Sequence, residues 1–186
     1  MRFIKEMYDL NIPGPMNFFD LLIIEEWATL VPENGVVVEV GSHLGRSSYC
    51  WAKSIPSSAT LYCVDIWDEY YEMNLAGESQ LMHRYEIFLE NVNSCKNIIP
   101  IKGKAPNINY PGNPIDIFYI DAGHYNPSDL QIIMHFKKFL KPNAKICGHD
   151  YSNFFPDVKT NVKILEHMYK TKVKRFKGSS QWEIQT

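Results

Sequence analysis

Apolar runs and mixed polar segments alternate along this chain in a way that predicts strands alternating with helices. The run Val36–Val40 is almost entirely β-branched and lies between Gly35 and Gly41, which is typical of a strand buried on both faces. Strands that alternate with helices favour a parallel sheet. Four further apolar runs predict strands at residues 60–64, 98–101, 115–120 and 144–147.

Helices are predicted where apolar residues recur at helical spacing. The first is expected over Asp20–Val31, with Phe19, Ile23, Trp27 and Leu30 on its buried face and Asp20 pointing elsewhere. Another is expected to begin with Asn126 as N-cap and Pro127 at its first position, and to run to Leu140. Three other helices are predicted. One follows Gly45, one carries an apolar stripe of Leu81, Tyr85, Phe88 and Val92, and one carries an apolar stripe of Val158, Val162, Leu165 and Tyr169.

The segments 172–176 and 181–184 predict an antiparallel hairpin, because Gly178-Ser179-Ser180 separates them. The whole chain is therefore expected to form one α/β domain over residues 1–186, with an N-terminal helical segment at 1–34 and a core at 35–186. Its sheet is predicted to be doubly wound, seven-stranded and mostly parallel, with the antiparallel hairpin at the C-terminal side. Ligands of such sheets bind beyond the carboxyl ends of the strands.

Composition narrows the classes of partner. A net charge of -2 offers no basic face for nucleic acid, and the chain has no run of about 18 apolar residues to span a bilayer. Charged residues interrupt the first segment, so we expect no signal peptide, no membrane partner and a cytoplasmic location. The four cysteines form no C-x-x-C pair, which favours buried, reduced thiols. They are Cys50, Cys63, Cys95 and Cys147.

The residues after the first three strands are candidates for holding a nucleotide-like ligand. Gly41 permits a tight turn and Gly45 a close approach to backbone, but His43 replaces the middle glycine of the dinucleotide fingerprint. Asp65 ends the second strand at the distance expected for an acid that accepts ribose hydroxyls. The small residues of Gly103-Lys104-Ala105 leave room for a flat base. A purely structural turn and a solvated aspartate remain alternatives.

The fourth and fifth strands end in acidic and histidine residues. If these strands are neighbours, Asp121 and Asp150 lie at the same edge, where paired carboxylates need a proton, a cationic group or a metal ion between them. Oxygen ligands would suit Mg²⁺, Ca²⁺ or Mn²⁺, and His149 either joins them or is held by a backbone carbonyl. His124 follows Asp121 by three residues, and its ordinary pKa near 6.5 suits a general base.

Four motifs follow one another along the chain: Glu39-Val40-Gly41-Ser42-His43-Leu44-Gly45-Arg46-Ser47, Val64-Asp65-Ile66-Trp67, Ile120-Asp121-Ala122-Gly123-His124-Tyr125 and Gly148-His149-Asp150-Tyr151. Taken together, they resemble the motifs of the class I S-adenosylmethionine-dependent methyltransferases, and within them a small O-methyltransferase-like branch with a Rossmann-like sheet. The terminal hairpin also resembles the antiparallel strand at the edge of that family's sheet, which dinucleotide dehydrogenases lack.

The resemblance implies a cofactor site for S-adenosylmethionine. Asp65 is expected to hold the ribose, with Trp67 near the adenosine and Gly103-Lys104-Ala105 near the base, and Asp121 is also expected to contact the cofactor. The residues expected around the methionine part are Glu39, Gly41, Ser42, Gly45 and Ser47.

The resemblance also implies a catalytic site beside the cofactor. Asp121 and Asp150, joined by His149, are expected to hold a divalent cation, and His124 is expected to deprotonate the acceptor hydroxyl with Asp121 beside it. The predicted reaction is O-methylation of a small molecule or a sugar. Two alternatives remain: a nicotinamide-dependent oxidoreductase, which the glycine pattern and hairpin disfavour, and a non-catalytic binding module on the same fold.

The acceptor itself is not specified by the sequence. Its binding wall is expected from irregular segments at residues 11–17, 69–77 and 152–155. The oligomeric state is also left open, with a homodimer as one alternative.

Overall fold

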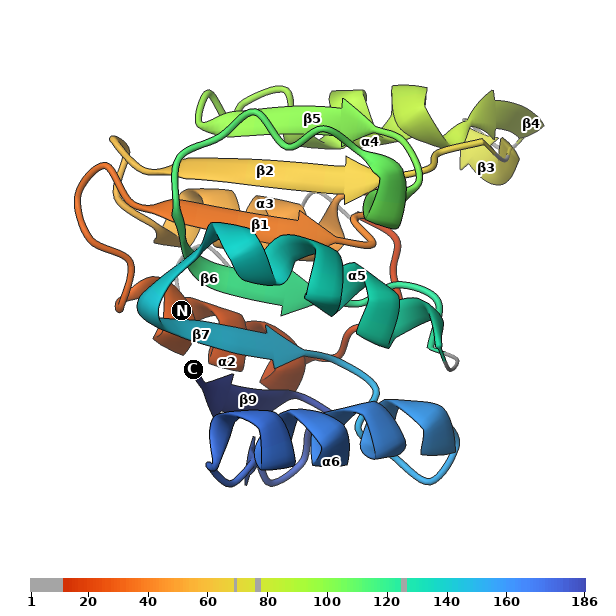
Figure 1. The fold of residues 1–186 in the computed structure, drawn as a ribbon. Coiled ribbons are helices and arrows are strands. Elements are labelled where there is room, and N and C mark those ends of the chain that lie inside the picture. Colours follow the sequence, from red (N-terminus) through yellow and green to blue (C-terminus); the bar gives the residue numbers. More distant parts are fainter. Residues whose placement is uncertain (1–11, 69, 76–77, 125–126) are drawn as a thin grey trace.

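The computed structural model describes residues 12–68, 70–75, 78–124 and 127–186. Its main sheet has seven strands in the order β5-β2-β1-β6-β7-β9-β8, and β9 runs antiparallel between β7 and β8 (Figure 1). The predicted fold class is confirmed. The strands are β1 (Val36–Val40), β2 (Thr60–Asp65), β5 (Ile98–Lys102), β6 (Ile115–Ile120), β7 (Leu140–Gly148), β8 (Lys174–Arg175) and β9 (Trp182–Gln185).

Parallel register brings the strand ends to one edge of the sheet. Val40, the last residue of β1, pairs with Val64 of β2 and with Ile120 of β6, and Ile120 pairs with Gly148 of β7. The residues that follow each of these strands therefore begin at the same level. All five residues of β1 are buried, as expected for a strand covered on both faces.

Helices cover both faces of the sheet. One hydrophobic cluster joins Trp27 and Trp51 to Tyr119, so that α2 and α3 pack on one face together with α4. A second cluster joins Phe118 of β6 to Phe136 of α5 on the other face, where α6 also packs (Figure 1). The helices are α2 (Phe18–Ala28), α3 (Arg46–Ser54), α4 (Arg84–Val92), α5 (Ser128–Phe136) and α6 (Pro156–Tyr169).

The predicted orientation of the N-terminal helix is confirmed for Ile23 and Trp27, which are buried, and wrong for the other residues of the predicted face. Phe19 is 55% exposed and Leu30, beyond the end of α2, is 59% exposed, whereas the side chain of Asp20 is buried. The apolar residues of this helix lie on most of its sides, so their spacing alone does not identify the buried face. Asn17 caps α2 in a capping box with Asp20, which fixes the start of the helix and turns the Asp20 carboxylate inward.

Two further predicted helix boundaries differ from the structure. Leu81 lies in a strand, because β3 (Tyr70–Leu75) and β4 (Glu78–His83) form a separate antiparallel pair and α4 begins only at Arg84. The segment expected to be irregular at 69–77 thus contains β3. Leu140 begins β7 rather than ending a helix, since Pro142 cannot continue a helix and a short 3₁₀ turn, Lys137–Phe139, intervenes.

The start of α5 is also shifted. Pro127 is the N-cap of this helix rather than its first residue, and Asn126, the predicted N-cap, lies outside the described residues. The prediction for the cysteines is confirmed, because all four are free and buried. No helix within the described residues combines the length and apolar character needed to cross a membrane.

Candidate functional site

The glycine turn, residues 41–45, joins β1 to α3 at the edge of the sheet. Gly41 and Gly45 adopt φ values of 95° and 93°, which favour glycine. A Cβ on Gly41 would lie 1.7 Å from the carbonyl oxygen of Asp121, so only glycine lets the two backbones approach this closely. Gly45 is the N-cap of α3 and provides no side-chain cap, which leaves the first N–H groups of that helix without a side-chain acceptor from the cap.

Asp65 fastens the glycine turn to the end of β2. One of its carboxylate oxygens accepts a hydrogen bond from the His43 N–H at 2.8 Å, and the other accepts one from the Trp67 N–H at 3.0 Å. Each oxygen keeps a further lone pair for a ligand. The predicted ribose-binding residue thus lies beside the turn, where it also orders the backbone.

Trp67 supports the turn from the interior. Its side chain is buried against Tyr85 and Phe88, and its indole N–H donates to the His43 carbonyl at 2.6 Å. The structure therefore gives Trp67 no exposed ring face for an adenosine. Gly103, at the end of β5, donates its N–H to the Asp65 carbonyl at 2.9 Å. This bond places Gly103-Lys104-Ala105 next to Asp65.

Glu39, Ser42 and Ser47 are buried around the glycine turn rather than on its surface. The Ser48 hydroxyl donates a hydrogen bond to the Glu39 carboxylate. Burial raises the pKa of Glu39, and the surrounding serine hydroxyls offset only part of that rise. Since the Glu39 side chain has no exposed surface, it stabilises the turn from below, and its contact with a cofactor stays a prediction.

Residues 12–16 cross over the glycine turn. Arg46 holds this segment at two points, donating hydrogen bonds to the Ile12 carbonyl at 2.7 Å and to the Met16 carbonyl at 3.1 Å. The segment and the turn line one pocket, and Asp121 forms part of the same wall. This segment, which is expected to contribute to the acceptor wall, therefore lies against the predicted cofactor residues.

The rim cluster comprises Asp121, His124, His149 and Asp150, which follow β6 and β7. His124 Nδ1 lies 3.3 Å from one Asp150 carboxylate oxygen, and its Nε2 lies 3.8 Å from Asp121. Ligand atoms of Asp121, His124 and Asp150 all lie within 4.8 Å of one another, a spacing that could hold a metal ion. The sheet thus brings both predicted carboxylates and the predicted base together.

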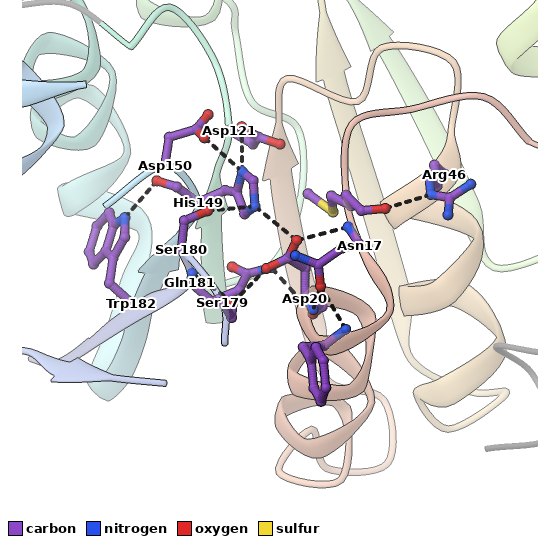
Figure 2. A network of polar contacts seen from close by, with 12 residues as sticks. Asn17, Asp20, Arg46, Asp121, His149, Asp150, Ser179, Ser180, Gln181 and Trp182 are labelled. Atoms are coloured by element: carbon purple, nitrogen blue, oxygen red, sulfur yellow. Dashed lines mark hydrogen bonds and ion pairs between the residues drawn. The ribbon is translucent and has the colours of Figure 1, made fainter. Parts of the chain in front are cut away.

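His149 lies between this possible metal group and Asp20. Its Nδ1 edge lies 3.1 Å from Asp150 and 3.8 Å from Asp121, while its Nε2 edge lies 3.3 Å from Asp20 and 2.9 Å from the Ser180 hydroxyl (Figure 2). Both ring nitrogens therefore face protein groups. The geometry favours an ion-pairing function over the predicted metal-ligand function of His149.

The charges in the rim cluster are strongly coupled. Burial raises the pKa of Asp121 to about 7, where the charge on His149 opposes the rise and the neighbouring carboxylate of Asp150 adds to it. Burial alone would lower the pKa of His149, but its contacts with Asp150 and Asp20 raise that pKa to about 10. His149 is thus a fixed cation at neutral pH, and it compensates the carboxylates that surround it.

Exposure distinguishes the two histidines. The side chain of His124 is 29% exposed, compared with 8% for His149. Both histidines line a second, small pocket of about 10 Å³, together with Ala122 and Asp129. His124 is therefore the histidine that a substrate group can reach from solvent, whereas His149 is largely enclosed.

The sequence predictions missed three residues of the site. Arg46 lay within a recognised motif but had no assigned contact, and Ser180 lay in a turn of the predicted hairpin. Asp20 was placed on the polar side of its helix. The Asn17-x-x-Asp20 spacing of the capping box was a detectable signal for the helix start, although it does not reveal which distant side chain Asp20 meets.

Comparisons with known proteins agree with this architecture. The family model of a methyltransferase domain matches residues 38–151, which include the glycine turn, Asp65 and the whole rim cluster. No curated protein sequence matches the chain.

Solved methyltransferase structures share the fold at low sequence identity. A methyltransferase from Geobacter sulfurreducens is 14% identical, with a TM-score of 0.68 over 98% of this chain and 84% of that one. A SAM-dependent methyltransferase from Aquifex aeolicus is 17% identical, with a TM-score of 0.65 over 98% and 96%. A TDP-rhamnose 3′-O-methyltransferase of calicheamicin biosynthesis is 12% identical, with a TM-score of 0.67 over 99% and 93%. At these identities the likeness establishes the fold alone.

Proposed function

We propose that this chain, which belongs to the methyltransferase-domain family, transfers a methyl group from S-adenosylmethionine to a hydroxyl of a small molecule or sugar. The observation that carries the proposal is the position of the rim cluster beside the glycine turn. Asp121 lines the pocket at the glycine turn, and the partly exposed His124 lies 3.8 Å from Asp121. A donor bound at the glycine turn and an acceptor bound at His124 would therefore meet at the rim cluster.

The glycine turn fits the donor. The uncapped N–H groups at the start of α3 suit a carboxylate such as that of the methionine part, and Asp65 retains lone pairs for ribose hydroxyls. Gly103-Lys104-Ala105 lies beside Asp65 and provides a small-residue wall for the base. When bound, S-adenosylmethionine supplies an electrophilic methyl group on its sulfonium.

His124 is proposed to remove the proton from the acceptor hydroxyl. Its side chain is 29% exposed, and Asp150 lies 3.3 Å from its Nδ1. A carboxylate at this position stabilises the imidazolium that forms when the proton is taken up. Alignment of the two reactants is expected to contribute about 7–11 kcal/mol, and the positioned base roughly 10²- to 10⁴-fold in rate.

A divalent cation fits the same cluster as an assisting group. The oxygens of Asp121 and Asp150 are ligands that Mg²⁺, Ca²⁺ and Mn²⁺ accept, and such an ion would lower the pKa of an acceptor hydroxyl. The His124 ring cannot use one nitrogen both as a ligand and as a base. We therefore assign the cation to the two carboxylates and leave His124 for proton transfer.

The test is titration calorimetry followed by a transfer assay. S-adenosylhomocysteine is titrated into the protein with and without Mg²⁺, with NAD as the matched control ligand, and methyl transfer from labelled S-adenosylmethionine is then measured on a panel of phenols and sugars. We expect saturable binding of S-adenosylhomocysteine and none of NAD. Binding of NAD alone would support an oxidoreductase, and binding without transfer to any acceptor would support a non-catalytic module.

A further inference from the structure

The carboxylate of Asp20 is the most deeply buried charged partner of the rim cluster. Its side chain is 2% exposed, and it lies on α2, in a part of the chain that the family model does not match. The Asn17 N–H donates to one carboxylate oxygen at 2.9 Å, and the Ser179 hydroxyl donates to the other at 2.5 Å. Asp20 is therefore fixed by the helix cap on one side and by the terminal hairpin on the other.

This fixed carboxylate faces the Nε2 edge of His149. The separation is 3.3 Å, and the Ser180 hydroxyl lies 2.9 Å from the same nitrogen (Figure 2). The opposite edge of the ring, at Nδ1, faces Asp150 at 3.1 Å. The backbone around the ring is fixed as well, because the His149 N–H donates to the Ile120 carbonyl and the His149 carbonyl accepts from the Trp182 indole.

A planar ring with partners on two opposite edges has little rotational freedom. If the Nε2 partners were removed, the ring could rotate about its side-chain bonds, and the Nδ1 edge would no longer be aimed at Asp150. Asp150 in turn lies against His124. The order of contacts thus runs from Asp20 through His149 and Asp150 to His124.

We propose that Asp20 is a positioning residue for the reaction. It holds the His149 ring so that the other edge of the ring orients the carboxylates of Asp150 and Asp121. Asp20 itself faces neither pocket and acts only through His149. The effect on rate rests on the proposed methyltransferase function, whereas the effect on the His149 ring does not.

The experiment compares Asp20→Asn, Ser180→Ala and the double variant. Asp20→Asn keeps the size of the side chain and removes its charge, and Ser180→Ala removes the second Nε2 partner while leaving the helix cap unchanged. The matched control is Glu26→Gln, an exposed carboxylate on the same helix. Thermal unfolding verifies that each variant is folded.

We expect kcat to fall roughly tenfold to hundredfold in Asp20→Asn, the usual scale for a residue that orients a functional ligand, with KM for the donor within about twofold. The decrease in kcat should be smaller in Ser180→Ala and larger in the double variant, and Glu26→Gln should keep the wild-type kcat. In a His149→Gln background, Asp20→Asn should cause no further loss, because two residues that act through one contact are not additive. Full additivity, or unchanged kcat in Asp20→Asn, overturns the proposal.

A nuclear magnetic resonance measurement separates this proposal from the proposed function. Ring ¹⁵N resonances of His149 are recorded in the wild type, in Asp20→Asn and in Glu26→Gln. We expect them to move in Asp20→Asn only. If the protein transfers no methyl group, the function fails, but the ring resonances still decide whether Asp20 positions His149; unmoved resonances overturn the proposal even in an active enzyme.

Discussion

The glycine turn and the rim cluster lie at the same edge of one sheet but are built by different means. The turn depends on backbone: glycines at positive φ, N–H groups of α3, and Asp65 accepting two backbone hydrogen bonds. The rim cluster depends on charge, with two histidines placed among the carboxylates of Asp121 and Asp150. Local chain geometry can therefore form the glycine turn, whereas the rim cluster forms only when distant segments of the chain come together.

The difference predicts different kinds of failure. A change in the glycine turn should damage folding and ligand binding together, because the same backbone serves both. A change in the rim cluster should reduce turnover while leaving the fold and the donor site largely intact. The following substitutions test that distinction, beginning with the largest expected effect.

Gly41→Ala should cause the largest loss of stability. The added Cβ would meet the Asp121 carbonyl at 1.7 Å in a backbone conformation that disfavours alanine, so unfolding free energy should fall by at least about 3 kcal/mol. Urea unfolding measures it. Gly45→Ala is the matched variant, since its Cβ meets the side chain of Val92 at 2.9 Å rather than backbone, and it should lose only about 1–2 kcal/mol. Equal losses at the two glycines would contradict the backbone argument.

His124→Ala should lower kcat roughly 10²- to 10⁴-fold through loss of the positioned base, with little change in S-adenosylhomocysteine affinity. Single-turnover methyl transfer and calorimetry measure the two effects separately. The control is His167→Ala, an exposed histidine on α6, which should keep wild-type kcat. If His124→Ala retains full kcat at neutral pH, the base assignment is wrong.

Asp65→Asn should weaken S-adenosylhomocysteine binding about tenfold, a typical loss for a hydrogen bond to a charged group. The amide can accept from only one of the two backbone N–H groups that the carboxylate now satisfies, so the turn should also become less stable. Calorimetry measures the affinity. Asp68→Asn, an exposed acid three residues later, is the control, and an equal loss there would argue against a specific contact.

Glu183→Gln tests an ion pair on β7 and β9 away from the rim cluster. Burial would raise the pKa of Glu183, but Lys145 at 2.9 Å and the Trp27 indole outweigh it and hold the pKa below its ordinary value of 4.5. The pair should therefore stabilise the fold by about 1 kcal/mol at neutral pH and lose this effect as the pH falls below about 4.5. Unfolding across pH should show wild type and variant converging in acid; a pH-independent difference would falsify the assignment.

Much of the fold could be predicted because it follows from local patterns. The β-branched run of Val36–Val40 and the glycines around it define a buried strand and a turn, and the other parallel strands of the main sheet are recognisable from their apolar runs. The failures were also local in origin. The helical spacing of Leu81 and Tyr85 led to a predicted helix where a strand ends at His83. The apolar residues on most sides of α2 prevented its buried face from being identified.

The same distinction between local patterns and distant contacts applies to the candidate site. Parallel strands end together, so the position of Asp121 and Asp150 after adjacent strands was enough to predict that their carboxylates meet. No local pattern indicates that Asp20 and Ser180, 160 positions apart along the sequence, contact the same nitrogen of His149.

By itself the sequence determined the alternation of elements, the order in which the motifs occur, and the sheet edge at which they gather. The tertiary structure alone decided which side chains are buried there, and hence which histidine is a fixed cation and which is accessible for proton transfer. The physical reason is that strand and turn preferences depend on neighbouring residues, whereas burial and charge compensation depend on which distant segments pack together.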